Sequence, residues 1–174
     1  MANIESTMTL RCRSIAFALP LLSVLLIGLV GCDQQAATAP SGLPTVSMKI
    51  GSNAFDLEVA DTDLTKEHGL MERDSMPSDH GMIFVFDADT TEPFWMHNTR
   101  FPLDILFVDQ AGKIVSIATM KAYDESSTFS KGPYRYAIEL SSGAAATAGV
   151  KSGDVLSLPK LPAHTGAAAP TTNQ

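Results

Sequence analysis

The sequence predicts a mostly β domain, a small antiparallel β-sandwich or barrel of about eight short strands with one short helix. Three observations favour this fold class. Apolar and polar residues alternate between residues 46 and 59, which is typical of strands with one buried face. Continuous apolar runs follow between residues 82 and 120, and short loops rich in Gly, Asp and Pro separate them. Such close spacing favours antiparallel neighbours and disfavours a βαβ arrangement.

The first elements are a hairpin and a helix. Residues 46–50 and 55–59 alternate on either side of a Gly-Ser-Asn turn, so we expect them to pair. Thr62 or Asp63 can cap a helix that runs towards Arg73, because apolar residues recur there at helical spacing. Gly69 lies inside that pattern and costs about 1 kcal/mol relative to Ala, so we expect the helix to be short or broken there.

The remaining elements are read from apolar runs. A run of apolar residues bounded by turn residues is typical of a strand that is buried on both faces. The sequence predicts further strands at residues 82–86, 94–97, 103–108, 113–120, 134–140 and 155–158, and a helical turn at 144–148.

The first thirty-one residues have the pattern of a signal peptide. Arg11 and Arg13 precede an apolar run over residues 15–30, which is short for a membrane span and contains Pro20. The run ends in Leu29-Val30-Gly31-Cys32, which resembles the lipobox of bacterial lipoproteins. We therefore expect Cys32 to carry a lipid that anchors the chain to a membrane of the bacterial cell envelope, facing the periplasm or the cell exterior. An ordinary signal peptide with an incidental cysteine is the alternative.

The domain organisation follows from composition. Residues 1–31 are expected to be the leader, 32–44 a flexible tether, 45–160 the folded domain and 161–174 a disordered tail. Only one cysteine follows the leader, which excludes a disulfide-stapled scaffold and a Cys-x-x-Cys zinc site in the mature chain. The formal charge of −7 offers no counterion-release binding, so we expect no nucleic-acid partner.

Four sequence blocks resemble one family. They are Gly69-Leu70-Met71, Gly81-Met82-Ile83-Phe84-Val85-Phe86, Phe94-Trp95-Met96-His97-Asn98-Thr99-Arg100-Phe101-Pro102-Leu103-Asp104 and Tyr136-Ala137-Ile138-Glu139-Leu140-Ser141-Ser142-Gly143. Their order and content resemble the DUF192 (UPF0127) family of small secreted or lipoprotein domains, over roughly residues 46–158. The resemblance implies a compact β-rich fold, and it implies no catalytic residue.

The leading functional interpretation is a non-catalytic binding domain. Long loops on a rigid β scaffold often carry binding, and exposed aromatic residues suit stacking on sugars or docking to partners. The loop over residues 121–132 contains Tyr123 and Phe129. With the turn that contains Trp95, His97, Asn98 and Arg100, and with Asp104 just beyond it, this loop is the expected binding surface. The ligand is expected to be a glycan, a small molecule or an envelope protein.

Asp104 supports a rival, catalytic interpretation. It stands in an apolar strand, and a buried carboxylate must be hydrogen-bonded, paired or protonated. Arg100 and the backbone N–H groups of residues 98–100 are the expected partners, and they would pin the turn. Alternatively, Asp104 serves as acid or base of an envelope hydrolase, with His97 or Glu139 as its partner. Alternation favours the solvent face for Glu139, and the sequence leaves open whether Glu139 and Asp104 share a cleft.

Copper is a third interpretation. Thioether and imidazole ligands suit Cu(I) in an oxidising compartment. Met96 and His97, joined by Met71, Met82 or His80, could supply three ligands. Adjacent strand residues point to opposite faces, so Met96 and His97 would need a bulge or a strand end to meet on one ion. The competing interpretation is that the methionines fill gaps in the core.

Overall fold

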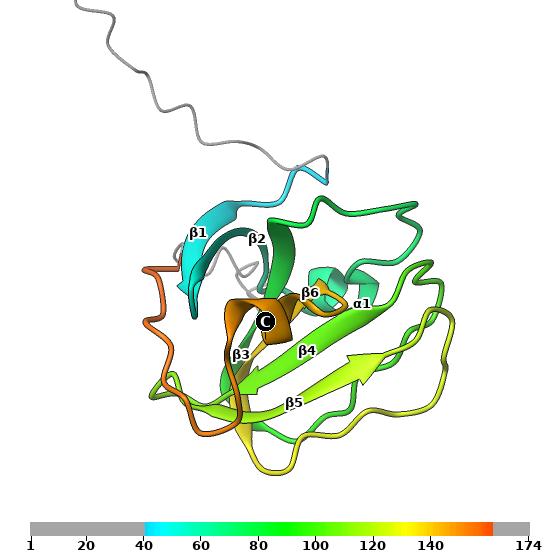
Figure 1. The fold of residues 1–174 in the computed structure, drawn as a ribbon. Coiled ribbons are helices and arrows are strands. Elements are labelled where there is room, and N and C mark those ends of the chain that lie inside the picture. The colour runs from blue at the N-terminus through cyan, green and yellow to red at the C-terminus, as the bar shows by residue number, and fades with distance from the viewer. Residues whose placement is uncertain (1–40, 162–174) are drawn as a thin grey trace, which may run out of the picture. The chain divides into compact units, whose positions relative to one another are not determined.

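The computed structural model describes residues 41–161, which form one open β-sheet with two short helices (Figure 1). These described residues belong to one compact unit. The expected signal peptide, Cys32 and the tail beyond residue 161 lie outside the described residues. The elements are β1 (Thr45–Ile50), β2 (Asn53–Ala60), α1 (Asp63–His68), β3 (His80–Thr90), β4 (Leu103–Val108), β5 (Ile114–Met120), β6 (Tyr134–Ser141) and α2 (Ala144–Ala148).

The sheet has six strands in the order β1-β2-β3-β6-β4-β5. Each neighbouring pair is antiparallel except β2 and β3, which are parallel and are joined by α1 and the loop over residues 69–79. The mostly β prediction is confirmed, whereas the described strands form a single open sheet and not a closed barrel. Two expected strands are absent from it, because residues 94–97 and 155–158 contribute only the isolated bridges Phe94–Thr128 and Lys113–Val155.

The helix α1 is short for the reason expected from its sequence. Thr62 caps its N-terminus by accepting the N–H of Thr65, while the Thr65 hydroxyl accepts the N–H of Thr62. The helix ends at Gly69, whose φ of 51° lies in the left-handed region that glycine adopts without a steric penalty. The chain therefore leaves the helix before Arg73 and continues as a loop across the sheet.

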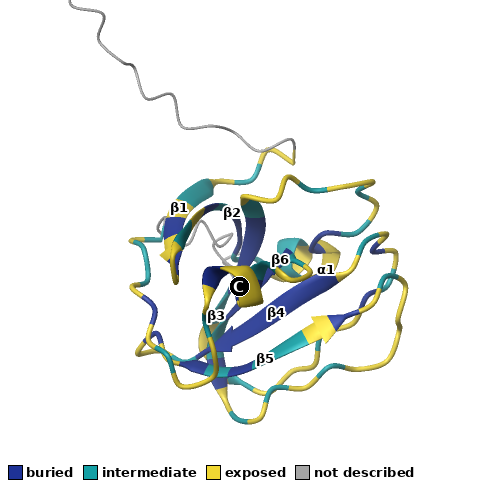
Figure 2. Ribbon diagram, viewed as in Figure 1, coloured by how far each residue is buried: buried dark blue, intermediate teal, exposed yellow. Residues whose placement is uncertain are grey.

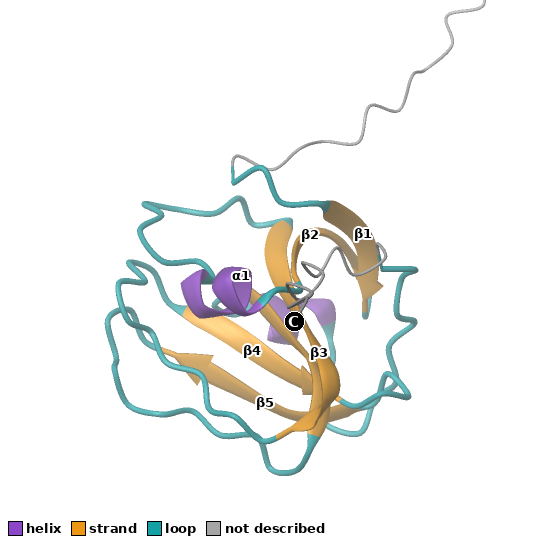
Figure 3. Ribbon diagram, turned by 180° about the vertical axis from the view of Figure 1, so that it is seen from behind, coloured by secondary structure: helices purple, strands orange, loops and turns teal. Residues whose placement is uncertain are grey.

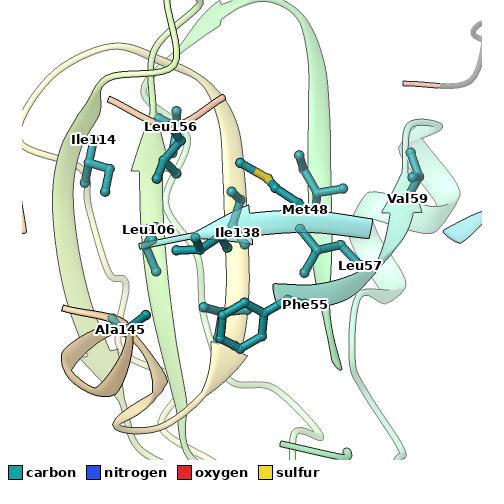
Figure 4. Packing of buried hydrophobic residues seen from close by; sticks show 14 residues of the cluster. Met48, Phe55, Leu57, Val59, Leu106, Ile114, Ile138, Ala145 and Leu156 are labelled. Carbon is teal, nitrogen blue, oxygen red and sulfur yellow. The ribbon is translucent and has the colours of Figure 1, made fainter. Parts of the chain in front are cut away.

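Both faces of the sheet are covered, which explains the continuous apolar runs. On one face, α2 and the segment after it cover a cluster that includes Leu57, Leu106, Ile138, Ala145 and Leu156, here called the α2-side core (Figure 4). The view from behind brings α1 to the front, whereas α2 lies in front in Figure 1 (Figure 3). All six residues of β4 are buried, and Figure 2 shows this strand dark blue along its length.

The opposite face carries a second cluster, the loop-side core. It includes the buried side chains Leu70, Met82, Met96, Leu103, Ile105, Phe107 and Tyr134. Loops at residues 69–77 and 94–101 cover this face, so the loops themselves supply part of its core. The fold therefore requires these loops to follow a fixed path. Core packing also holds in place any site that the loops form.

Asp104 is the buried carboxylate that connects β4, β5 and α2. One carboxylate oxygen accepts the Thr119 hydroxyl at 2.8 Å, and the other accepts the backbone N–H groups of Gly143 at 2.9 Å and Ala145 at 3.1 Å. The prediction that Arg100 and the backbone N–H groups of residues 98–100 are the partners of Asp104 is therefore wrong. Asp104 points to the face that α2 covers, and it satisfies N–H groups at the start of that helix, which otherwise have no partner within it.

Replacing Asp104 should destabilise the domain. Asp104→Ala removes a buried carboxylate that accepts from three donors, of which the N–H of Ala145 is itself buried, and is expected to cost about 3 kcal/mol of unfolding free energy. Asp104→Asn should cost clearly less, since the amide oxygen can accept both N–H groups while its NH₂ donates to the Thr119 hydroxyl. Urea unfolding of the three proteins measures this. An Asp104→Ala protein as stable as the wild type would refute the structural role and would favour the catalytic interpretation.

Candidate functional site

The two segments expected to form a binding surface do lie side by side. Phe94 and Thr128 exchange both backbone hydrogen bonds, at 3.0 and 2.7 Å, and the N–H of Met96 donates to the Asp124 carbonyl at 3.0 Å. Trp95 is exposed between two residues that point into the loop-side core. Its indole stacks on the His97 ring with centroids 5.2 Å apart, and His97 Nδ1 lies 2.8 Å from a Glu125 carboxylate oxygen.

Asn98 and Arg100 hold the loop over residues 69–79. The Asn98 carbonyl accepts the backbone N–H of Glu72 at 2.9 Å, and Arg100 forms an ion pair with Asp74. The sequence predicts a pairing of Arg100 with Asp104. In the structure Arg100 lies in an exposed turn, where the carboxylate of Asp74 in the neighbouring loop is its partner. These two residues therefore connect the Trp95 turn to the neighbouring loop.

Glu139 is buried, so its expected place on the solvent face is wrong. Its side chain does lie opposite the α2-side core, but the loops cover that second face as well. In the sheet register Glu139 is paired with Ile105, whereas Asp104 is paired with Leu140. Paired residues share a face and adjacent ones do not, so Asp104 and Glu139 lie on opposite faces of the sheet. They do not share a cleft.

The residues of the copper hypothesis have different surroundings. Met82 and Met96 are buried in the loop-side core, the His97 ring is partly exposed beside Glu125, and Met71 is partly buried in a separate cleft. Within residues 41–161 no group of three or more His, Cys, Asp or Glu residues is arranged to hold a metal ion. Met96 and His97 point to opposite sides, as expected for neighbours in an extended segment.

A hollow lies beneath α1 and the loop over residues 69–79. It is a cleft of about 760 Å³, within the range of sites for small molecules. Its apolar lining side chains are Leu43, Leu64, Met71, Met76 and Pro77, and its polar ones include Glu58, His68, Glu72, Arg73 and His80. Sequence analysis did not assign this site.

An ion pair between the buried Glu58 and the partly buried Arg73 forms the polar part of the cleft. Arg73 donates to both carboxylate oxygens of Glu58, at 2.5 and 2.8 Å, and the Ser41 hydroxyl donates to one of them. Burial alone would raise the pKa of Glu58, but these hydrogen bonds and the positive charge of Arg73 lower it below its usual value. Glu58 is therefore ionised, and the guanidinium keeps three of its five N–H groups for other partners.

Glu139 lies in the row of paired residues across the sheet that also contains Glu58, two strands away from it. Glu58 is paired with Met82 in the sheet register, and Met82 is paired with Glu139, so all three side chains share a face. Desolvation raises the pKa of Glu139 to about 8, although the charge of Arg73 opposes the rise. The site thus combines one ionised carboxylate, one carboxyl group that is neutral at pH 7, and one arginine.

A histidine stands at the rim of the cleft. His80 Nδ1 lies 2.9 Å from a carboxylate oxygen of Asp79, and hydrogen bonding to His80 lowers the pKa of Asp79. This contact leaves the other ring nitrogen of His80 as the one that can meet a ligand.

Sequence reasoning missed Glu58 and Arg73 for a physical reason. Glu58 belongs to an alternating strand whose polar face is normally solvated, and Arg73 follows the predicted helix. The local pattern does not predict that the loop over residues 69–79 crosses the face of the sheet that carries Glu58. The apolar residue Met76 of the loop was the available signal that this segment packs against the sheet.

Fold and site define a small, mostly β domain with a ligand-sized cleft over one face of its sheet. The profile of the DUF192 family, described as "Uncharacterized ACR, COG1430", matches residues 46–158. This chain belongs to the DUF192 family.

Among the solved structures that resemble this chain are two from different organisms. A protein of unknown function from Novosphingobium aromaticivorans DSM 12444 is 34% identical, with a TM-score of 0.64 and coverage of 70% of this chain and 91% of that one. A protein from Sinorhizobium meliloti 1021, described as a "putative transcription regulator", is 34% identical, with a TM-score of 0.60 and coverage of 65% and 91%. No curated protein matches the chain.

The buried Glu139 should make stability depend on pH. The unfolded chain releases this proton above about pH 4.5, whereas the folded protein keeps it until about pH 8. The folded state binds more protons in that window, so wild-type stability should lose about 1.4 kcal/mol per pH unit through this group as the pH rises. Glu139→Gln cannot titrate, so its stability relative to wild type should increase from pH 5 to pH 8 and then level off.

Urea unfolding at several pH values measures the difference in unfolding free energy between Glu139→Gln and the wild type. The contributions of the other titrating groups largely cancel in this difference. Glu67→Gln, which removes an exposed carboxylate from α1, controls for the general effect of lost charge. A constant difference between Glu139→Gln and wild type across this range would contradict the raised pKa.

Proposed function

We propose that this protein is a lipid-anchored cell-envelope domain that binds a small amphipathic ligand in the cleft beneath α1. The observation that carries the proposal is the composition of the cleft, in which apolar walls surround a fixed polar pair. Such a lining is typical of small-molecule sites, where apolar contacts supply affinity and a few polar groups fix orientation. Met71 and Met76 add adaptability, because unbranched thioether side chains can repack around ligands of different shape.

The geometry favours binding over chemistry at this cleft. Both oxygens of Glu58 are engaged by Arg73, so Glu58 is poorly placed to accept a proton from a substrate. Glu139 is buried behind it and is not among the residues that line the cleft. A polar ligand group can instead accept from the remaining N–H groups of Arg73, which Glu58 holds in a fixed orientation.

The expected anchor would place this cleft close to a membrane. Ser41 lines the cleft, and Cys32 precedes it by nine residues, so a fully extended tether spans at most roughly 30 Å. Amphipathic molecules concentrate at membrane surfaces, which suits a receptor held within that distance. No helix among residues 41–161 is long and apolar enough to cross a membrane. The acidic chain, with a sequence pI near 4.9, is poorly suited to nucleic acid, so we do not extend the description of the Sinorhizobium protein to it.

A charge placed on the cleft wall should weaken ligand binding. Leu64 is 77% exposed and lines the cleft, so Leu64→Glu should leave the fold intact and lower the affinity for the uncharged probe N-phenyl-1-naphthylamine by roughly tenfold or more. Val155→Glu is the matched control, since Val155 is 69% exposed and lies outside the cleft. Probe fluorescence with residues 33–174 measures both. Equal loss in the two variants, or no saturable binding by the unmodified domain, would argue against this site.

Lipidation is tested separately from binding. In a bacterial host fed an alkyne analogue of palmitate, the wild-type chain should be labelled and should sediment with membranes. Cys32→Ala should abolish the label, whereas Cys12→Ala should keep it, because Cys12 lies within the expected leader. Label that persists in Cys32→Ala would show that the lipobox interpretation is wrong.

A further inference from the structure

Three exposed aromatic side chains gather on two adjoining segments away from the cleft lining. Trp95, Tyr123 and Phe129 are 52%, 60% and 63% exposed. All three lie on the turn over residues 94–100 or the loop over residues 121–132, which are joined by backbone hydrogen bonds. Most large aromatic residues are buried in folded domains, so three exposed ones on joined segments mark a surface that contacts something else.

The Trp95 ring is held in a defined orientation. The His97 ring stacks on it with an interplanar angle of 24°, and Glu125 fixes that imidazole through a contact from the other segment. The N–H of Thr99 donates to the Met96 carbonyl at 3.1 Å, which closes the turn behind the two rings. The indole is thus an exposed and preorganised flat surface, which lowers the entropic cost of stacking a ligand on it.

The backbone beneath this surface is strained. Within residues 41–161, the non-glycine residues with positive φ are Glu72, Asn98 and Tyr123, at 66°, 50° and 58°. All three meet at one turn, because the N–H of Glu72 donates to the Asn98 carbonyl and the N–H of Tyr123 donates to the Thr99 carbonyl. A bulky residue such as tyrosine rarely adopts this conformation, and such outliers gather where function requires them.

Local charge indicates which ligand suits the aromatic surface. The three cations Arg100, Lys121 and Lys131 are matched in number by Asp74, Asp124 and Glu125, and Arg100 is already paired with Asp74. The surface therefore lacks the excess of positive charge that anionic lipid or a polyanion requires. A neutral polyol fits better, because carboxylates accept hydrogen bonds from hydroxyl groups and the face of an indole attracts the C–H groups of a sugar ring.

We propose that Trp95, His97 and Tyr123 form a carbohydrate-binding platform for a neutral oligosaccharide, independent of the ligand cleft. Trp95 stacks on one pyranose ring, His97 and Glu125 keep the indole in place, and Tyr123 contacts a neighbouring ring of the same chain. Phe129 extends the apolar edge of the platform.

The experiment uses the fact that Trp95 is the only tryptophan of the chain. The full chain in phosphatidylcholine vesicles is titrated with chitotriose and with cellotriose while tryptophan emission is recorded. Stacking should shift the emission to shorter wavelength and should saturate. Calorimetry should show binding lost in Trp95→Ala, weakened several-fold in Tyr123→Ala, and unchanged in Val155→Ala. Thermal unfolding of each variant checks that it is folded. If Trp95→Ala is unfolded, the binding affinity of Tyr123→Ala decides the test.

Two results would overturn the proposal. One is the absence of a saturable emission change with either trisaccharide. The other is strong quenching of Trp95 in vesicles of brominated phosphatidylcholine, which would place the aromatic surface in the lipid and identify it as a membrane contact. Neither result bears on the cleft, because Leu64 and the probe assay do not involve this surface.

Discussion

Arg73 meets Glu58 where the loop over residues 69–79 crosses the sheet, and the path of that loop depends on this contact. A buried charge without a partner is costly, so removing Arg73 leaves the buried carboxylate of Glu58 unpaired and is expected to cost about 3 kcal/mol of unfolding free energy. The same arginine stands near Glu139, whose carboxyl group stays neutral at pH 7 because it is buried. The cleft and its polar centre thus follow from how this one guanidinium is placed, whereas the pH dependence of stability follows from the burial of Glu139.

The loop over residues 69–79 also connects the two candidate sites. Its residues Met71, Arg73 and Met76 line the cleft, while Glu72 and Asp74 contact Asn98 and Arg100 in the Trp95 turn. The loop therefore contributes to both surfaces, and Glu72 belongs to both, because it lines the cleft while its backbone N–H donates to the Asn98 carbonyl. Membership of the DUF192 family gives the protein a fold class and relatives of unknown function, so the chemistry of these two surfaces carries the functional argument.

Local sequence predicted those elements well whose pattern is contained within a single strand or turn. The strand at residues 103–108 and the helical turn at 144–148 match β4 and α2, and Gly69 ends α1 as its conformational freedom suggested. The apolar run at 94–97 was wrong as a strand, because its apolar side chains fill the loop-side core without pairing in the sheet. Apolar periodicity reports burial, and burial under a loop gives the same signal as burial in a sheet.

The sequence by itself determined the mostly β class, the hairpin of β1 and β2 and the acidic charge, because each depends on composition or on neighbours along the chain. Only the tertiary structure decided that Asp104 caps α2, that Arg73 pairs with Glu58, and that Glu139 is buried on the face opposite Asp104. Each of these depends on strand order and on loops that return across the sheet. A carboxylate has the same local sequence signature whether water, an arginine or a helix N-terminus lies in front of it, so partners distant along the chain decide its role.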